Sequence, residues 1–318
     1  CKTRRQRQMC IRDRGMTVRG AVIQAAPQAF DLDETLKRCA RLAREAADQG
    51  AKIAVFPEAF IGGSPKGLDF GARVGSRSEE GRKDFERYFW AAIDVPGQAT
   101  KRLGDIAKSL KMTLVIGVIE RDGGTLYCTV LYIGEDGSLL GKHRKLMPTA
   151  MERLIWGFGD GTTLKAVDTP VGRIGAVICW ENYMPMLRMA MYRQGVMLYC
   201  APTVDDRDAW LPTMQHIAYE GRCFVLSACQ FAKRSDYPED YDCIQGNDPE
   251  SVLIRGGSCI IDPFGKVLAG PRFGEQAVLV ADLDLGAIVQ GKFDLDVAGH
   301  YERPDVFQFK TVGMEEEQ

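Results

Sequence analysis

The sequence has little of what metal, membrane and nucleic-acid sites require. It contains three histidines, His143, His216 and His300, which lie far apart, and no Cys-x-x-Cys pair, so we expect no zinc site of the usual ligand spacing. No apolar run approaches the roughly 20 residues that span a bilayer. The net charge of −2 gives no basis for binding nucleic acid or an anionic membrane surface. What remains is typical of a globular protein, with 45% hydrophobic and 26% charged residues.

The ten cysteines do not follow the pattern of a secreted disulfide framework. Several lie inside apolar segments, where a thiol packs as a small hydrophobic side chain. These are Cys128, Cys179, Cys200, Cys229 and Cys259. Buried free thiols are typical of a reducing compartment, so the sequence predicts a cytoplasmic protein.

The two ends of the chain differ in composition from the rest. Residues 1–15 are basic, have almost no apolar periodicity and lack the hydrophobic stretch of a signal peptide. Because the run MCIRDR resembles a translated sequencing adapter, we expect this segment to be non-native or disordered and the natural protein to start at Met16. A basic targeting arm is the alternative. The acidic end, MEEEQ, is typical of a disordered tail.

Between these ends, short apolar strands alternate with amphipathic helices. A strand over 18–26 is followed by a helix whose predicted N-cap is Asp33, and then by a buried strand that ends at Pro57. A polar, glycine-rich stretch over roughly 61–84 is long for a connection, so we expect a functional loop or an oligomer contact. A helix near 97–111 and further strands follow, and the second half repeats the alternation. The pattern indicates an α/β layered architecture in one domain.

One cysteine has a local context that favours chemistry. Cys179 stands at the end of the apolar strand 174–178, directly before a polar tripeptide and an apolar helix. A strand-to-helix turn holds a side chain at the sheet edge and directs backbone N–H groups toward it, where they stabilise an anion. Most buried cysteines are packing residues. We therefore interpret Cys128, Cys200 and Cys229 as packing residues, whereas Cys179 is either a packing residue or a nucleophile.

A thiol nucleophile needs a base, because a free thiol is mostly protonated at neutral pH. None of the histidines stands in a motif typical of a thiol protease, so we expect a carboxylate. Glu58 directly follows a buried strand, where an unpaired carboxylate is costly, and is either a surface residue or a site residue. Lys145, in the basic run GKHRK, and Glu152 would each be assigned to a solvated surface if considered alone.

Taken together, these four positions resemble the nitrilase superfamily of carbon–nitrogen hydrolases, whose active site consists of Glu, Lys, Glu and Cys. The resemblance covers residues 16–305 and implies that Glu58, Lys145, Glu152 and Cys179 are catalytic. The segments that carry it are long and specific: FPEAF, HRKLMPT with the ER that follows, CWENYMP, CAPTVDDRDAW, HIAYEGRCFVLSACQ, RGGSCIIDPFGKVLAGP and DLDVAGHYERPDV.

The resemblance also implies a fold and an assembly. We expect a four-layer αββα sandwich with two mixed β-sheets over residues 16–305, followed by a tail over 306–318. We further expect a homodimer or a larger homo-oligomer such as a spiral. The stretches 61–84 and 231–252 are the candidates for additional contacts between subunits.

Within the superfamily, CWENYMP is similar to the true nitrilases. This implies hydrolysis of a nitrile to the carboxylic acid and ammonia through a covalent thioimidate and thioester on Cys179. Glu58 would be the base and Glu152 would orient Lys145. Lys145 would stabilise the developing charge with the backbone N–H of Trp180. The Trp180 side chain either borders the substrate pocket or packs in the core. Every proton transfer has a side-chain partner, so we expect no cofactor, and the nitrile and water as small-molecule partners.

Several alternatives stay open at this stage. An amidase or carbamoylase uses the same four groups, and a nitrile or cyanide hydratase releases an amide instead of an acid. A non-catalytic scaffold and a thiol protease that depends on a histidine belong to other classes. No spacing rule locates the pocket, so aliphatic, aryl and arylacetonitriles and cyanide all remain candidate substrates.

Overall fold

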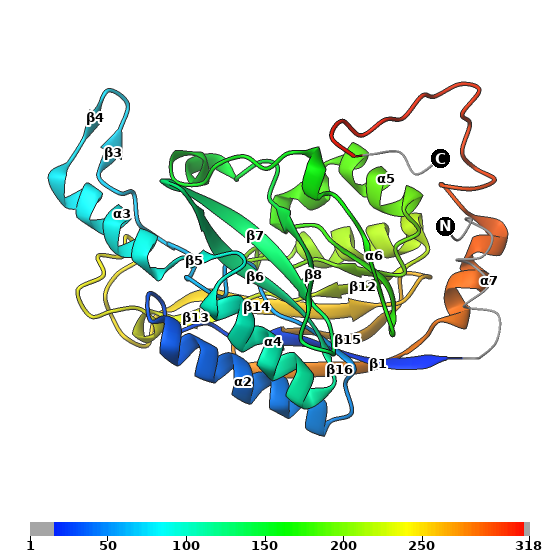
Figure 1. Ribbon diagram of the computed structural model, residues 1–318, viewed down its shortest axis with the longest axis horizontal. Helices are drawn as coiled ribbons and strands as arrows, with labels where there is room; N and C mark the ends of the chain where they lie inside the picture. The colour runs from blue at the N-terminus through cyan, green and yellow to red at the C-terminus, as the bar shows by residue number, and fades with distance from the viewer. Residues whose placement is uncertain (1–15, 315–318) are drawn as a thin grey trace.

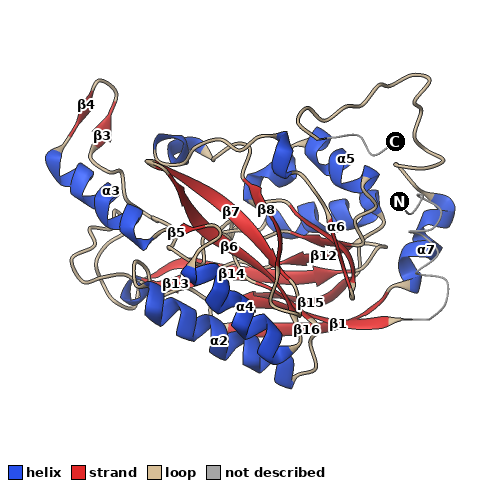
Figure 2. Ribbon diagram, in the orientation of Figure 1, coloured by secondary structure: helices blue, strands red, loops and turns tan. Residues whose placement is uncertain are grey.

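The computed structural model describes residues 16–314, and the expectation for residues 1–15 concerns a segment outside them. Two β-sheets pack face to face, and helices cover the outer face of each sheet (Figure 1, Figure 2). The expected four-layer αββα sandwich with two mixed sheets is therefore confirmed. No helix among the described residues is long and apolar enough to cross a membrane.

The first sheet has the strand order β16-β1-β2-β6-β7-β8, and β5 pairs with β6. The central pairs β1–β2 and β2–β6 are parallel, whereas β1–β16, β6–β7 and β7–β8 are antiparallel. The bounds are β1 Thr17–Gln24, β2 Ile53–Val55, β5 Ile93–Asp94, β6 Thr113–Asp122, β7 Thr125–Ile133, β8 Leu139–Arg144 and β16 Ala277–Asp284.

The second sheet has the order β13-β14-β12-β11-β10-β9, and β15 pairs with β14. Strands β10, β11 and β12 run parallel, so their carboxyl ends meet at one edge. A hairpin that turns at Pro263 and Gly265 forms the antiparallel pair β14–β15. The bounds are β9 Val167–Thr169, β10 Gly172–Ala176, β11 Leu198–Cys200, β12 Phe224–Ser227, β13 Phe231–Lys233, β14 Val252–Ile261 and β15 Val267–Phe273.

The outer helices bury one apolar face each. On the first sheet lie α2 (Leu32–Asp48) and α4 (Gln98–Leu110), and on the second lie α5 (Pro185–Arg193) and α6 (Trp210–Gly221). The predicted N-cap at Asp33 is wrong, because Asp31 is extended and accepts the backbone N–H of Glu34. Asp33 instead lies in the first turn, where its charge favours the helix dipole.

Alternate residues of the strands face two different cores. In β1, Ala21 and Ile23 pack against α2 and α4, whereas Val22 points to the second sheet. Between the sheets, Val22 and Val55 join Ile174 and Leu226 in one buried cluster. Because both faces of these strands are buried, successive residues are all apolar and the strands appear in the sequence as continuous apolar runs.

The glycine-rich stretch over 61–84 contains more structure than expected. It forms the hairpin β3 (Ala72–Arg73) and β4 (Ser76–Arg77), and it runs into α3 (Glu79–Ala91), which Ser78 caps. The hairpin and α3 stand out from the body of the molecule (Figure 1).

The end of the described chain passes over the second half of the molecule. Helix α7 (Gly286–Asp294) follows β16, and the segment after it contacts α5 through the Arg193 guanidinium, 5.5 Å from the ring centre of Phe309. Short 3-10 helices complete the fold: η1 Ala150–Leu154, η2 Gly161–Thr163, η3 Cys179–Tyr183 and η4 Arg234–Asp236.

Candidate active site

Cys179 occupies the predicted turn between a strand and a helix. Strand β10 ends at Ala176, η3 begins at Cys179, and α5 follows. The cysteine has φ of 50°, a left-handed conformation that non-glycine residues rarely adopt. Its N–H donates to Pro202 O at 2.9 Å, and the Asn182 amide donates to its carbonyl at 2.8 Å. These bonds offset the strain and hold the thiol in a buried position.

Lys145 lies between the two predicted glutamates. Its Nζ donates to Glu58 Oε1 at 2.7 Å and to Glu152 Oε2 at 2.9 Å. The side chains of Lys145 and Glu58 are fully buried, and that of Glu152 is 23% exposed. Glu58 follows β2, Lys145 extends β8 by pairing with Cys128, and Glu152 is in η1. The structure thus brings together a base candidate, an ammonium and a second carboxylate from three separate segments.

The charges of this cluster act on Cys179. Burial raises the pKa of the thiol, and the Glu58 carboxylate raises it further, whereas Lys145 and the hydroxyl of Thr203 lower it. Burial lowers the pKa of Lys145, but Glu58 and the other nearby acidic groups outweigh it, so its pKa lies well above the usual value. Burial and the charge of Glu58 raise the pKa of Glu152. Lys145 therefore stays protonated, and the thiol is neutral until a base removes its proton.

The two oxygens of Glu58 differ in their surroundings. Oε1 accepts from Lys145 and also from the thiol of Cys128 at 3.5 Å. Oε2 is buried and has no hydrogen-bond partner among the described residues. One oxygen is thus fixed, and the other is available to accept a proton.

Cys128 belongs to the surroundings of the site, although the sequence favoured a packing role. It is in β7, and its thiol donates to Glu58, a residue that is distant in the sequence. The ring of Trp156 lies 5.4 Å from Lys145 Nζ, and its indole N–H donates to the hydroxyl of Tyr88 at 3.2 Å. No local sequence signal identifies these neighbours, because tertiary packing alone brings them to the lysine.

Glu181 and His143 connect the segment of the lysine to that of the cysteine. The buried Glu181 carboxylate accepts the N–H of Leu146 at 2.6 Å and that of Ile178 at 2.8 Å. His143 Nε2 lies 3.0 Å from Glu181 Oε2. Burial raises the pKa of Glu181, but His143 and the two N–H groups lower it more, so its pKa is below the usual value. Neither residue is among the site residues that the sequence predicted.

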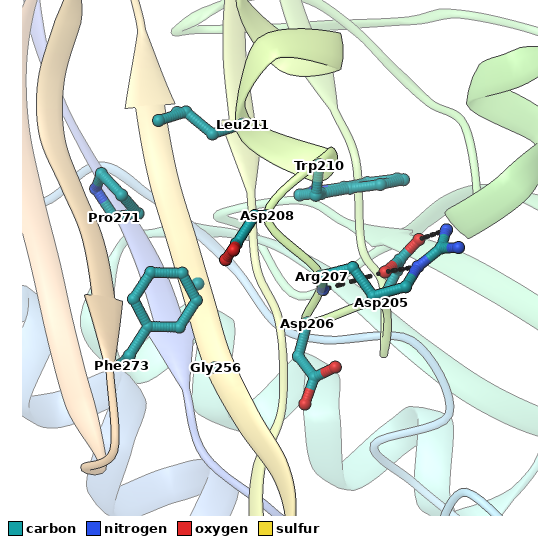
Figure 3. A pocket seen from close by; sticks show the side chains of 10 residues that line it. Asp205, Asp206, Arg207, Asp208, Trp210, Leu211, Gly256, Pro271 and Phe273 are labelled. Atoms are coloured by element: carbon teal, nitrogen blue, oxygen red, sulfur yellow. Dashed lines mark hydrogen bonds and ion pairs between the residues drawn. The ribbon is translucent and has the colours of Figure 1, made fainter.

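Trp180 follows Cys179 in the chain and lies at the surface. Its side chain is 43% exposed, and its indole N–H donates to Asp205 Oδ2 at 2.9 Å. The guanidinium of Arg207 lies 4.8 Å from the ring centre of Trp180. Asp205 accepts hydrogen bonds from this guanidinium (Figure 3). The core-packing interpretation is therefore wrong for this side chain, and its contact with substrate stays a prediction.

A cavity of about 190 Å³ adjoins the same segment. Figure 3 shows its lining, which runs from Asp205 to Leu211 and includes Phe273 of β15, but none of the four predicted catalytic residues. Thr203 connects the cavity wall to the site, because its hydroxyl accepts the N–H of Asp205 at 2.8 Å and donates to Cys179 Sγ at 3.1 Å.

Within the described residues, the three histidines bond to or pack on groups other than the Cys179 thiol. His143 contacts Glu181 and Thr163, His216 pairs with Glu220 on the exposed face of α6, and His300 packs on Tyr301. Within residues 16–314, no group of three His, Cys, Asp or Glu side chains is arranged to hold a metal ion.

Known proteins resemble this chain over most of its length. The family model for carbon–nitrogen hydrolases matches residues 19–293. A nitrilase of Bradyrhizobium diazoefficiens is 58% identical over 93% of this chain and 92% of its own. A bifunctional nitrilase/nitrile hydratase of Lupinus angustifolius is 57% identical over 91% of this chain and 84% of its own. The fold of a Saccharomyces cerevisiae member of branch 10 of the nitrilase superfamily matches with a TM-score of 0.69 at 21% identity, over 91% and 97% of the two chains. The chain therefore belongs to the carbon–nitrogen hydrolase family, within the nitrilase superfamily.

Proposed function

We propose that the protein hydrolyses an organic nitrile to the carboxylic acid and ammonia, with Cys179 as the nucleophile. The observation that carries this proposal is the buried Lys145 between Glu58 and Glu152, whose charges act on the thiol of Cys179. The relatives named as nitrilases, which match over nine-tenths of the chain, support nitriles as the substrate class.

In the first half of the reaction, Cys179 becomes bound to the substrate. Glu58 takes the thiol proton through its free Oε2, and the sulfur attacks the nitrile carbon. The electron pair moves to the nitrile nitrogen, where Lys145 and the N–H of Trp180 stabilise the charge. Glu58 then returns the proton to that nitrogen, which gives a neutral thioimidate. Glu152 keeps Lys145 in position and balances its charge.

In the second half, two water molecules are consumed. Glu58 activates the first water, which adds to the thioimidate carbon and forms a tetrahedral intermediate. Loss of ammonia leaves a thioester, and attack of the second water releases the acid and restores the thiol. The net change is R–C≡N plus two water molecules giving R–COOH plus ammonia.

Turnover by variants in which one cysteine is replaced tests the proposal. We would measure ammonia and acid from an aliphatic nitrile, an aryl nitrile, an arylacetonitrile and cyanide, with wild type, Cys179→Ala and Cys200→Ala. Cys200 is the matched control, because it is also buried and its thiol donates to the backbone carbonyl of Leu198, outside the predicted site. We expect Cys200→Ala to resemble wild type and Cys179→Ala to lose turnover and any covalent adduct by intact mass. Turnover by Cys179→Ala would refute the mechanism.

The same assay addresses the amide-forming alternative. One relative is named for both nitrilase and nitrile hydratase activity. Expulsion of the Cys179 sulfur from the tetrahedral intermediate, instead of ammonia, releases an amide. Product analysis of each nitrile therefore gives the acid-to-amide ratio, and incubation with the matching amides identifies an amidase. Turnover of amides with no turnover of any nitrile would overturn the assignment to nitriles.

We also propose that residues 16–305 act as one catalytic domain in a cytoplasmic homo-oligomer. Both stretches named as contact candidates support this assembly, because they lie together. The hydroxyl of Tyr237 donates to Ser64 O at 2.8 Å, and that of Tyr241 donates to Lys66 O. Trp90 on α3 is 66% exposed. Light scattering coupled to size-exclusion chromatography should give at least a dimer, whereas a monomer would refute this part.

A further inference from the structure

Thr203 is a fully buried polar residue whose hydroxyl is directed at the nucleophile. Its Oγ1 lies 3.1 Å from Cys179 Sγ. The same oxygen accepts the backbone N–H of Asp205 at 2.8 Å. A hydroxyl has a single proton, and because the N–H of Asp205 occupies an acceptor position, the Thr203 proton is left to point at sulfur.

The fold places Thr203 and Cys179 side by side for a simple reason. Strands β10 and β11 are parallel, and Ala176 is paired with Cys200. Continuing that register by three residues past each strand end brings Cys179 opposite Thr203. The N–H of Cys179 donates to Pro202 O, and the N–H of Thr203 donates to Ala228 O at 2.9 Å. Backbone bonds on both neighbouring strands thus fix the two side chains relative to each other.

We infer that Thr203 is a catalytic residue that stabilises the Cys179 thiolate by donating a hydrogen bond to its sulfur. This inference rests on the proposed function, in which Cys179 is the nucleophile. When Glu58 removes the thiol proton, negative charge develops on a buried sulfur, and a preformed donor at 3.1 Å stabilises that charge. The bond weakens when sulfur bonds to carbon and strengthens again when the thiolate leaves the thioester. Thr203 keeps its own proton throughout.

The test removes the hydroxyl while keeping the shape of the side chain. The variants are Thr203→Val, Thr203→Ser and Thr113→Val, each made in the full chain. Thr113 of β6 is the matched control, because it is equally buried and its hydroxyl has no partner among the described residues. We would measure kcat/KM with a nitrile, together with the pH dependence of Cys179 alkylation by iodoacetamide. Intact mass follows the alkylation, and Cys179→Ala supplies the background.

We expect the alkylation profile of Thr203→Val to shift upward by about one pH unit and kcat/KM to fall about 10- to 100-fold, the loss expected for a hydrogen bond to a charged group. Thr203→Ser should stay within about threefold of wild type, because it retains the donor. Thr113→Val should match wild type. Should Thr203→Val not yield folded protein, Thr203→Ala removes the same hydroxyl and leaves only a small cavity.

Two outcomes would overturn the inference. One is an unshifted alkylation profile in the variant without the hydroxyl. The other is an equal loss in Thr203→Ser, which would mean that the shape of the side chain matters and its hydroxyl does not. If Cys179→Ala were still alkylated and active, the proposed function itself would fail. If Cys179→Ala were inactive and Thr203→Val normal, only the role of Thr203 would be wrong.

Discussion

The carboxylate of Glu181 offers the most direct test of how the site is held together. The carboxylate accepts the N–H of Ile178, which directly precedes Cys179, and that of Leu146, which directly follows Lys145. The change Glu181→Gln keeps the size of the side chain but removes its charge and one acceptor oxygen. It therefore breaks the connection between the two segments without adding volume.

The expected loss can be worked out from the contacts. A glutamine has one acceptor oxygen, so the N–H of either Ile178 or Leu146 faces an amide NH₂ group and stays unsatisfied, at a cost of about 1–3 kcal/mol. The bonds that remain, including that from His143, lose their charge assistance, which costs about 1–2 kcal/mol more. The free energy of unfolding should therefore fall by about 2–5 kcal/mol. Turnover should fall about tenfold or more, because the nucleophile and the lysine both shift.

Denaturant unfolding and ammonia release at fixed protein concentration measure the two effects. The control is Glu34→Gln in α2, whose side chain is 45% exposed and forms only a loose pair with Lys37, so its loss should stay within about 1 kcal/mol. The pKa of Glu181 is lowered from 4.5, so its contribution is present above pH 4.5 and is lost as the pH falls below that value. The difference in the free energy of unfolding between wild type and Glu181→Gln should therefore become smaller as the pH falls below 4.5. A Glu181→Gln enzyme with wild-type turnover and less than about 1 kcal/mol of lost stability would refute this reasoning.

Three further predictions concern the surroundings of the lysine. Cys128→Ala removes a weak donor to Glu58 and should lower kcat only severalfold, whereas complete loss would assign Cys128 a direct part in the chemistry. A Cβ added at Gly117 would lie 2.7 Å from Glu58 Cα, so Gly117→Ala should destabilise the fold by about 1–3 kcal/mol and displace the base, as thermal unfolding and turnover would report. Glu152 has a pKa above 4.5 and has to be ionised to hold Lys145, so kcat/KM should already decrease before the pH is lowered to 4.5. A pH–rate profile that stays flat down to pH 4.5 would contradict this.

The ends of strands were the most informative sequence feature. Cys179 and Glu58 each follow a short apolar strand, whereas Lys145 follows the basic strand β8, and side chains at strand ends can reach a common edge. The alternation of strands and helices predicted the layered α/β class, because strands and helices differ in the spacing of their apolar residues. Local patterns therefore predicted the elements and the positions of the candidate site residues.

The remaining features depend on contacts between distant segments. Helix α3 was missed because its buried face is aromatic and packs on Phe70 and Phe30, which only the folded chain brings near. The contact of Cys128 with Glu58 requires that β2 and β7 both pair with β6, and no spacing in the sequence records this. Thr203 is an intermediate case. Its place after a strand parallel to that of the nucleophile is readable once the strand order is known, and that order comes from the structure.

The four residues of the site come from both sheets of the sandwich. Glu58 and Lys145 extend strands of the first sheet, and Cys179 extends a strand of the second. The reaction therefore requires that the sheets dock at the correct distance, which the apolar side chains between them determine. The rate of turnover therefore depends on how the two sheets pack. A small change in packing at Val55 or Ile174 that leaves the chain folded should lower turnover before it measurably lowers the free energy of unfolding.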